Sequence, residues 1–277
     1  FGLMGVINLA HGELMMLGAY TTYVTQLVFK LPLLKPYYNA YVIVSIFLAF
    51  IVSGVVGILL EKTVIRKLYG SPLETLLATW GVSLILQQFV RSVPLAYGTG
   101  LIISLIVGLF LPTIFSSRIK ESINFKYIRF SCWILAVLSG VLTGNLISSS
   151  VSKLSRASAR NVDVTAPAWM RGQVEILGTA FPKTRLMIII ITLISVIAIT
   201  LFLNQSAWGM RIRAVTQNRE MSDCLGISTE KVDVLTFGIG SGLAGVAGVA
   251  VSLLGSVGPN VGGNYIVGCF MVVVLGG

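Results

Sequence analysis

Long apolar runs that hold almost no charge are the feature that most restricts how this chain can fold. A run of about 20 mainly apolar residues is long enough for a helix to cross a bilayer, and such runs recur along the sequence. Charged residues make up 11% of the chain, whereas a soluble domain usually carries about 25%. We therefore expect an all-α fold, a polytopic transmembrane helix bundle, because a spanning β-barrel would show short alternating segments instead.

About eight spans are visible in this pattern. They are expected at Phe1–Val28, Ala40–Leu60, Leu73–Arg91, Thr99–Phe115, Phe130–Ser149, Leu186–Leu203, Val232–Leu254 and Tyr265–Gly277. The sequence opens at Phe1 and closes on VVVLGG, both inside apolar runs, so we expect a bundle that is truncated at both ends.

Positive charge concentrates in alternate loops, and this pattern predicts the orientation of the bundle. The net charge is +10, but no basic stripe has interleaved aromatic residues, so we expect no nucleic-acid partner. By the positive-inside rule, the loops that contain residues 62–67, 118–129 and 204–231 are predicted to be inside. The segment 150–185 is basic yet falls outside, and its Gly, Pro, Val and Ile residues predict a small external hairpin or an interfacial segment.

Three polar residues interrupt the apolar stretch GVINLAHGELMMLGAY near the start of the chain. Asn8 and His11 can share one helical face, whereas Glu13 lies about 200° around the helix from His11. All three could share a face only if the backbone breaks, which Gly12 would allow. Polar side chains at membrane depth usually face a bundle interior or a wet pathway. They therefore either cap a helix break and bond to neighbouring helices, or line a transport path.

The longest polar excursion on the predicted inner side is SAWGMRIRAVTQNREMSDCLGISTEK. Residues Arg213 to Leu225 can form a short helix, with Gly226 as its C-cap. Apolar contacts would come from Val215, Cys224 and Leu225. Such a helix suits docking into a groove of a soluble partner; the alternative is a solvated loop whose arginines only fix the topology.

Several stretches resemble the permease subunits of ABC importers for branched-chain amino acids and urea. They are INLAHGE near the start, GMRIRAVTQNREMSDCLGI in the long inner loop and GPNVGGNYIVGCFMVVVLGG at the end. The stretches TLLATWGVSLILQQFVR, RNVDVTAPAW and NYIV resemble the urea-type branch in particular. Compared with shorter relatives, Ser92–Ala159 is an insertion that adds two of the expected spans.

The resemblance implies a single transmembrane permease domain over residues 1–277, with 204–231 as its cytoplasmic coupling loop. The implied partners are a second permease subunit, two cytoplasmic ABC ATPase subunits, an external periplasmic solute-binding protein and the lipid bilayer of a bacterial plasma (inner) membrane. The ATPase-coupling helix would contain Arg213, Ala214, Gln217, Asn218, Arg219, Asp223, Leu225 and Gly226. The chain has no Walker A sequence, so we expect no enzyme activity of its own, no cofactor and no metal site.

The resemblance also implies that the INLAHGE stretch lies near the translocation path. A neutral solute such as urea needs hydrogen-bond donors and acceptors rather than a charged clamp. The candidate path residues are Asn8, His11, Gly12, Glu13, Thr79, Ser83, Gln87 and Gln88. Two positions depart from the family pattern, because Gly268 stands where an acidic residue is expected and Asp223 where a small apolar residue is expected.

Two further classes of protein remain as alternatives. A self-contained secondary transporter or channel for a small polar solute would need ion-coupling residues within the spans, where Glu13 is almost the only acidic candidate. A membrane-embedded hydrolase using His11 and Glu13 would need a nucleophile placed beside a base, and the sequence offers none.

Overall fold

A computed structural model describes most of the chain outside the central region. The described residues are 8–30, 35–69, 71–92, 161–176 and 179–276, together with isolated positions between 138 and 145. The chain divides into two compact units, one formed by Phe1–Gln87 with Asn161–Gly277 and the other by Gln88–Arg160. The expected insertion Ser92–Ala159 belongs to the second unit, and the architecture below is that of the first.

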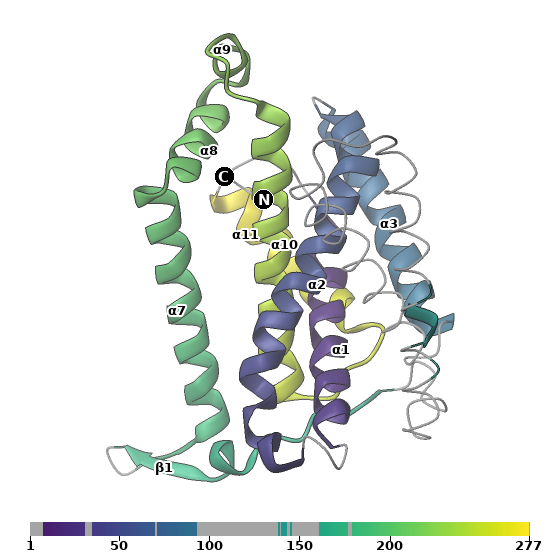
Figure 1. The fold of residues 1–277 in the computed structure, drawn as a ribbon, viewed down its shortest axis with the longest axis vertical. Helices are drawn as coiled ribbons and strands as arrows, with labels where there is room; N and C mark the ends of the chain where they lie inside the picture. The colour runs from purple at the N-terminus through teal and green to yellow at the C-terminus, as the bar shows by residue number, and fades with distance from the viewer. Residues whose placement is uncertain are drawn as a thin grey trace, which may run out of the picture. The chain divides into compact units, whose positions relative to one another are not determined.

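Helices dominate the described chain (Figure 1). In chain order the elements are α1 (His11–Phe29), η2 (Lys35–Ala40), α2 (Tyr41–Thr63), η3 (Ile65–Leu68), α3 (Pro72–Ser92), η4 (Ala168–Met170), β1 (Gln173–Ile176), β2 (Thr179–Pro182), α7 (Lys183–Gln205), α8 (Ala207–Gln217), α9 (Arg219–Cys224), α10 (Thr229–Leu254) and α11 (Val261–Gly276).

Four of these helical segments are long and apolar enough to cross a membrane. They are Lys35–Thr63, Leu73–Arg91, Lys183–Gln205 and Thr229–Leu254. The predicted fold class, a helical protein with membrane-spanning segments, is therefore confirmed. The expected spans Thr99–Phe115 and Phe130–Ser149 lie outside the described residues, apart from isolated positions of the second.

The centre of the bundle is formed by α10 packed against α2 and α1. Small residues allow these backbones to approach closely, which is the usual way for helices to associate in lipid. A Cβ atom added to Gly18 would overlap the backbone of Gly245, and one added to Gly248 would overlap the carbonyl oxygen of Met15. The glycines of α1 and α10 therefore set the distance between these two helices.

Hydrogen bonds between loops define the two ends of the bundle. At one end, Arg66 Nη1 donates to Glu230 Oε2 at 3.0 Å, which joins the loop after α2 to the start of α10. At the other end, Trp169 Nε1 donates to the carbonyl oxygen of Asn39 at 2.9 Å. Among the described residues, the predicted inside loops 62–67 and 204–231 thus share one end, and Asn39 and Trp169 lie at the other, while the orientation in a membrane stays a prediction.

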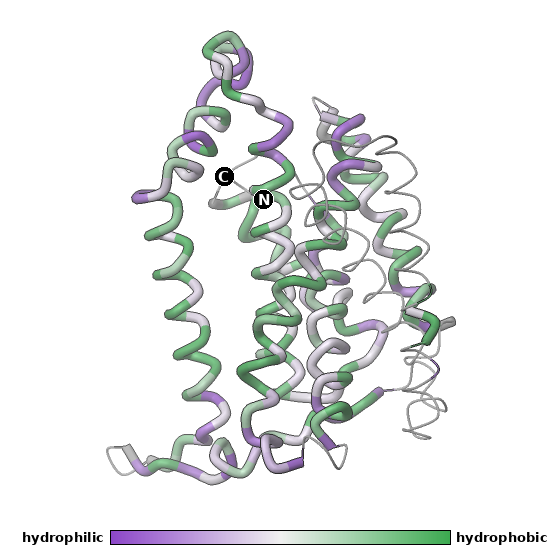
Figure 2. The backbone as a smooth tube through the Cα atoms, in the orientation of Figure 1, coloured by the Kyte–Doolittle hydropathy of each residue, from purple (hydrophilic) through white to green (hydrophobic). Residues whose placement is uncertain are grey.

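A β-hairpin lies at the second end, in the segment that was predicted to be a hairpin or an interfacial segment. Strands β1 and β2 pair in antiparallel register, with Gln173 opposite Pro182 and Ile176 opposite Thr179. The second strand leads directly into α7, which is apolar along nearly its whole length (Figure 2). Ile191 is the one buried side chain of α7, and exposed apolar residues such as Leu193, Ile194 and Ile197 leave much of the helix open to lipid or to another chain.

Helix α3 is polar on its buried side and apolar on its exposed side. Thr75, Thr79 and Ser83 are 5%, 2% and 3% exposed, and their spacing of four residues places them in one stripe. Leu77 and Trp80 lie on the exposed surface instead. This arrangement reverses that of a helix on a water-soluble protein and is typical of a helix between lipid and a polar interior.

Candidate functional site

The candidate path residues gather where α1 begins, halfway along the bundle. Ser53 lies near the middle of α2, roughly 18 Å along the helix from Tyr41. Its Oγ donates a hydrogen bond to the carbonyl oxygen of Leu14, in the first turn of α1, at 3.0 Å. The polar start of α1 therefore lies at mid-depth rather than at an end of the bundle.

The backbone turns into α1 at Asn8. Asn8 Oδ1 accepts a hydrogen bond from the backbone N–H of Ala10 at 3.0 Å, and Asn8 O accepts from the N–H of His11 at 3.3 Å. The helix thus begins at His11, and the break that Gly12 would have allowed does not occur there. Gly12 instead lies inside the helix, where a Cβ would overlap the carbonyl oxygen of Gly262. Its lack of a side chain allows α1 and α11 to touch.

Glu13 is the buried carboxylate of this region, with 0% of its surface exposed. Its Oε1 accepts hydrogen bonds from Ser83 Oγ at 3.1 Å and from Gln87 Nε2 at 2.7 Å. Both donors are neutral and lie on α3. Its Oε2 is buried and has no hydrogen-bond partner within the described ranges. We call these three residues the Glu13 cluster.

The polar stripe of α3 also supports the backbone before α1. Thr79 Oγ1 accepts a hydrogen bond from the N–H of Leu9 at 3.1 Å. Gln88 is exposed and points about 100° away from Gln87 on the helix. The structure therefore brings Glu13, Ser83 and Gln87 together and sets Thr79 against the preceding turn, whereas Gln88 faces elsewhere.

The start of α11 completes the surroundings of the Glu13 cluster, and the sequence did not predict it. The span was expected to begin at Tyr265, but α11 begins at Val261. A Cβ added to Gly262 would lie 2.9 Å from Glu13 Cδ, whereas one added to Gly263 would meet nothing within 4 Å. The starts of α1 and α11 thus meet beside one buried carboxylate. The glycine pair in VGGNY was the available signal.

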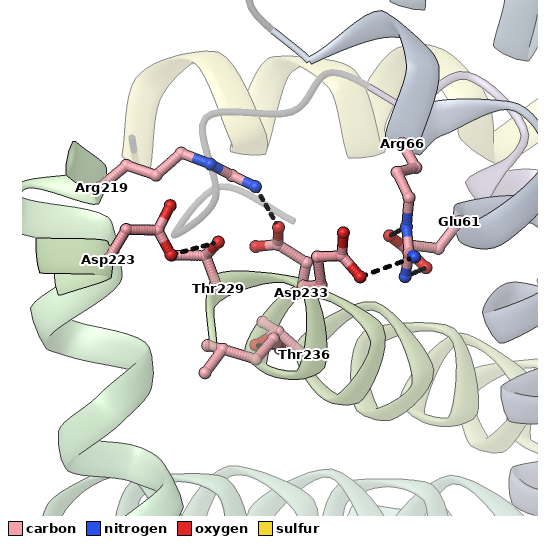
Figure 3. A network of polar contacts seen from close by, with 9 residues as sticks. Glu61, Arg66, Arg219, Asp223, Thr229, Asp233 and Thr236 are labelled. Atoms are coloured by element: carbon pink, nitrogen blue, oxygen red, sulfur yellow. Dashed lines mark hydrogen bonds and ion pairs between the residues drawn. The ribbon is translucent and has the colours of Figure 1, made fainter. Parts of the chain in front are cut away.

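A second set of buried acids lies at the end of the bundle that carries η3 and α9 (Figure 3). Both oxygens of Glu61, which is 0% exposed, accept from Arg66, with Oε1 3.2 Å from Nε and Oε2 3.3 Å from Nη2. Arg66 also binds Glu230, and the hydrogen bond to Glu61 raises the pKa of the Arg66 guanidinium. The arginine therefore stays charged and ties α2 to α10.

The same end holds a second ion pair, which reaches α9. Arg219 Nη2 donates to Asp233 Oδ2, on α10, and the guanidinium carbon of Arg219 lies 4.5 Å from the ring centroid of Tyr69. Burial raises the pKa of the Tyr69 hydroxyl, and the nearby carboxylates of Asp233 and Glu61 raise it further. We call these groups, with Arg66 and Glu230, the inner-end network.

The single coupling helix expected between Arg213 and Leu225 is in fact two helices. Asn218 adopts an extended conformation (φ −153°, ψ 104°) after α8, and its Oδ1 accepts from the N–H of Met221 as the N-cap of α9. A break forms because this side chain competes for backbone N–H groups. Gly226 was predicted to be the C-cap, but Leu225 caps α9, and Gly226 follows it with φ +79°, the left-handed conformation common one residue beyond a cap.

The candidate coupling residues differ in what they contact. Val215 is buried with Ile212 and Val232, so the prediction that it docks a partner is wrong. Leu225 is 78% exposed and remains available for docking. Asp223 Oδ1 accepts from Thr229 Oγ1 at 3.0 Å, which ties α9 to the start of α10.

The remaining coupling candidates lie along α8 and the break. Arg213 Nη1 donates to Asn204 Oδ1 at 3.0 Å, so it links α8 to the end of α7. Gln217 is exposed, and Ala214 is half-buried. No three His, Cys, Asp or Glu side chains lie close enough to hold a metal ion in the part of the chain that the structure describes.

An apolar helix bundle with buried polar groups at mid-depth is typical of membrane transport proteins, among others. Residues 1–277 match the model of one family, described as branched-chain amino acid transport system / permease component. The chain belongs to this family of permeases. No solved structure matches the chain.

Curated relatives agree with that assignment. The high-affinity branched-chain amino acid transport system permease protein LivH of Escherichia coli (strain K12) is 25% identical over 283 residues, covering 100% of this chain and 71% of LivH. LivH of Salmonella typhimurium is 24% identical with the same coverage. The permease protein BraD of Pseudomonas aeruginosa is 23% identical over 279 residues, again covering 100% of this chain and 71% of the relative.

Proposed function

We propose that this chain is one of two permease subunits of an ATP-driven importer of urea in a bacterial inner membrane. An external binding protein would deliver the solute, and two cytoplasmic ATPases would drive the change between outward-facing and inward-facing states. The family is described as one component of a transport system, which disfavours the self-contained transporter. ATP hydrolysis would belong to the separate ATPase subunits.

One observation supports a small neutral solute more than any other. The groups that bind Glu13 from α3 are a hydroxyl and an amide, and both donate to the same carboxylate oxygen. They belong to the stretch TLLATWGVSLILQQ, which also carries the resemblance to the urea-type branch. Neutral donors on α3 at mid-depth suit a molecule that is itself neutral and polar.

A branched-chain amino acid is the second candidate solute, because the relatives named above are permeases for such amino acids. Uptake of labelled urea and of labelled leucine would separate the two, in cells that hold the permeases, the ATPases and the binding protein. We expect urea to accumulate in an ATP-dependent manner. Accumulation of leucine without urea would overturn the choice of solute.

The proposed contact with the ATPase depends on α9, which is tied to α10 by two side-chain hydrogen bonds. Leu225, at its end, is 78% exposed, and its replacement should therefore not disturb packing within the chain. We expect Leu225→Ser to weaken co-purification of the ATPase while membrane insertion stays normal. Leu254→Ser, at the far end of α10 and 56% exposed, is the matched control. Full ATPase binding by Leu225→Ser would contradict the proposed contact.

A further inference from the structure

The Glu13 cluster has a polar atom that the fold leaves without a partner. Glu13 is 0% exposed, and its Oε1 is bound by Ser83 and Gln87, but its Oε2 has no hydrogen-bond partner among the described residues. A buried acceptor of this kind is costly, and native structures rarely keep one without a purpose. A bound molecule is one partner that would satisfy this oxygen.

The start of α11 offers the opposite kind of group beside that oxygen. The first N–H groups of a helix have no acceptor within the helix, and the helix dipole gives this end a partial positive charge. Gly262, in this first turn, approaches Glu13 so closely that an added Cβ would lie 2.9 Å from Glu13 Cδ. A hydrogen-bond acceptor and a set of donors thus lie side by side at mid-depth.

The first turn of α11 is open on the side that faces away from the contact with α1. An added Cβ on Gly263 would meet no atom within 4 Å. Gly263 and Asn264 are both exposed, although Gly262 next to them is buried against α1. The open space therefore begins one residue from the contact between the two helices.

We propose that Glu13 and the first turn of α11 form the point at which the permease recognises its solute. Glu13 Oε2 accepts an N–H group of the solute, and the backbone at Gly263 receives the oxygen of the same molecule. Urea presents an N–H and a carbonyl oxygen side by side, so it matches both groups at once. This inference rests on the proposed function for the identity of the solute, since an amino acid would present an ammonium and a carboxylate to the same two groups.

Substitution of the carboxylate tests the first half of this arrangement. In the complete transporter, Glu13→Gln should reduce the uptake of labelled urea at least tenfold, mainly through a higher KM, because an amide would place a donor against the N–H of the solute or lose its bonds to α3. Glu74→Gln is the control, since Glu74 is an exposed acid outside the cluster. Wild-type KM in Glu13→Gln, with the complex assembled, would overturn the proposal.

Two glycines of α11 form a matched pair that tests the second half without disturbing the carboxylate. Added Cβ atoms at Gly263 and Gly268 would each meet nothing within 4 Å, and alanine favours a helix more than glycine does, so both variants should assemble. We expect Gly263→Ala to reduce uptake severalfold and Gly268→Ala to leave it unchanged. Equal uptake by the two variants would overturn the proposal, even if Glu13→Gln fails to assemble.

Running each variant with labelled urea and labelled leucine separates this inference from the proposed function. If the wild type moves leucine and not urea, the proposed solute is wrong, and the effects of Glu13→Gln and Gly263→Ala are then measured on leucine. If the wild type moves urea and neither variant affects it, the solute stands and the recognition point is wrong.

Discussion

Buried carboxylates occur at two levels of this molecule, and their partners differ in kind. Glu61 and Asp233, at the inner end, are 0% and 3% exposed, and each is paired with an arginine. Glu13, at mid-depth, is equally buried, but within the described part of the chain it receives hydrogen bonds on one oxygen alone, from Ser83 and Gln87. The acids at the inner end have charged partners within the fold. Glu13 has neutral partners, and they occupy one of its two oxygens.

This difference indicates two separate tasks. A buried ion pair joins segments, because removal of one partner leaves an unpaired charge in a medium of low dielectric. The inner-end network thereby fastens α9 and η3 to α2 and α10, which places any force on α9 directly on the centre of the bundle. A carboxylate with neutral donors and one open oxygen is suited instead to a partner that arrives and leaves.

The largest effect is expected from reversal of charge at Glu61. Glu61→Lys would place a buried ammonium against Arg66, and breaking a buried pair alone costs about 3–5 kcal/mol. We expect the protein to be lost from the membrane fraction, as measured by immunoblot and by co-purification of partners. Glu74→Lys, at an exposed acid, should accumulate normally. Normal abundance of Glu61→Lys would show that the inner-end network does not hold the fold.

A smaller effect is expected from Asp233→Asn, because Arg219 is 42% exposed in its side chain and can be hydrated. Loss of a charged hydrogen bond costs about 1.5–3 kcal/mol. We expect assembly to survive, while solute uptake falls about tenfold and ATP hydrolysis by the partner ATPases continues. The double variant Arg219→Asp with Asp233→Arg should recover part of the uptake. Equal loss of uptake and hydrolysis would instead indicate simple damage to the fold.

At mid-depth the same chemistry should affect binding rather than abundance. Gln87→Leu removes the 2.7 Å hydrogen bond to Glu13 Oε1 but leaves the bond from Ser83. We expect the KM for solute to rise about threefold to tenfold, since about 1 kcal/mol is a typical net value for one hydrogen bond. Membrane abundance should match the wild type. A fall in membrane abundance with unchanged KM would show that Glu13, like Glu61 and Asp233, serves to hold the fold.

The smallest effect is expected from Tyr69→Phe. The Tyr69 hydroxyl is buried without a hydrogen-bond partner among the described residues, and the ring that lies under Arg219 is kept. Burial raises the hydroxyl pKa above its ordinary value of 10.0. The Tyr69 hydroxyl therefore stays protonated and neutral throughout the range from pH 6 to pH 9. Uptake against pH should therefore coincide for the variant and the wild type, within about 0.5 kcal/mol in stability. A displaced pH profile would reveal a role for the hydroxyl.

The helical class and four of the eight expected span positions could be predicted because apolar length is a local property of the sequence. The hairpin at β1 and β2 was likewise visible as turn residues among β-branched ones. The residues of the Glu13 cluster were also named in advance, because a carboxylate, a hydroxyl and an amide are conspicuous in apolar runs. Their meeting was not predictable, since it depends on how α3 is turned against α1.

What escaped prediction depended on backbone geometry rather than composition. The break between α8 and α9 follows from one residue, Asn218, whose extended conformation and capping bond no periodicity reveals. The close contact of Gly12 with Gly262 required the path of α11, which is remote in sequence. The function of Gly12 was misjudged for this reason, because a glycine that allows a bend and a glycine that allows contact look the same in a sequence.

Helix α3 buries its polar side and exposes its apolar side, and this arrangement limits which substitutions the helix can accept during evolution. Positions such as Leu77 and Trp80, turned away from the polar stripe, should accept many apolar replacements and reject charges. Positions Thr79 and Ser83 should accept other hydroxyl or amide residues and reject bulky hydrocarbons. A scan of every substitution along this helix would then show tolerance that repeats about every four residues. Apolar replacements would be tolerated on the exposed face and polar ones on the buried face, the reverse of a helix that borders water.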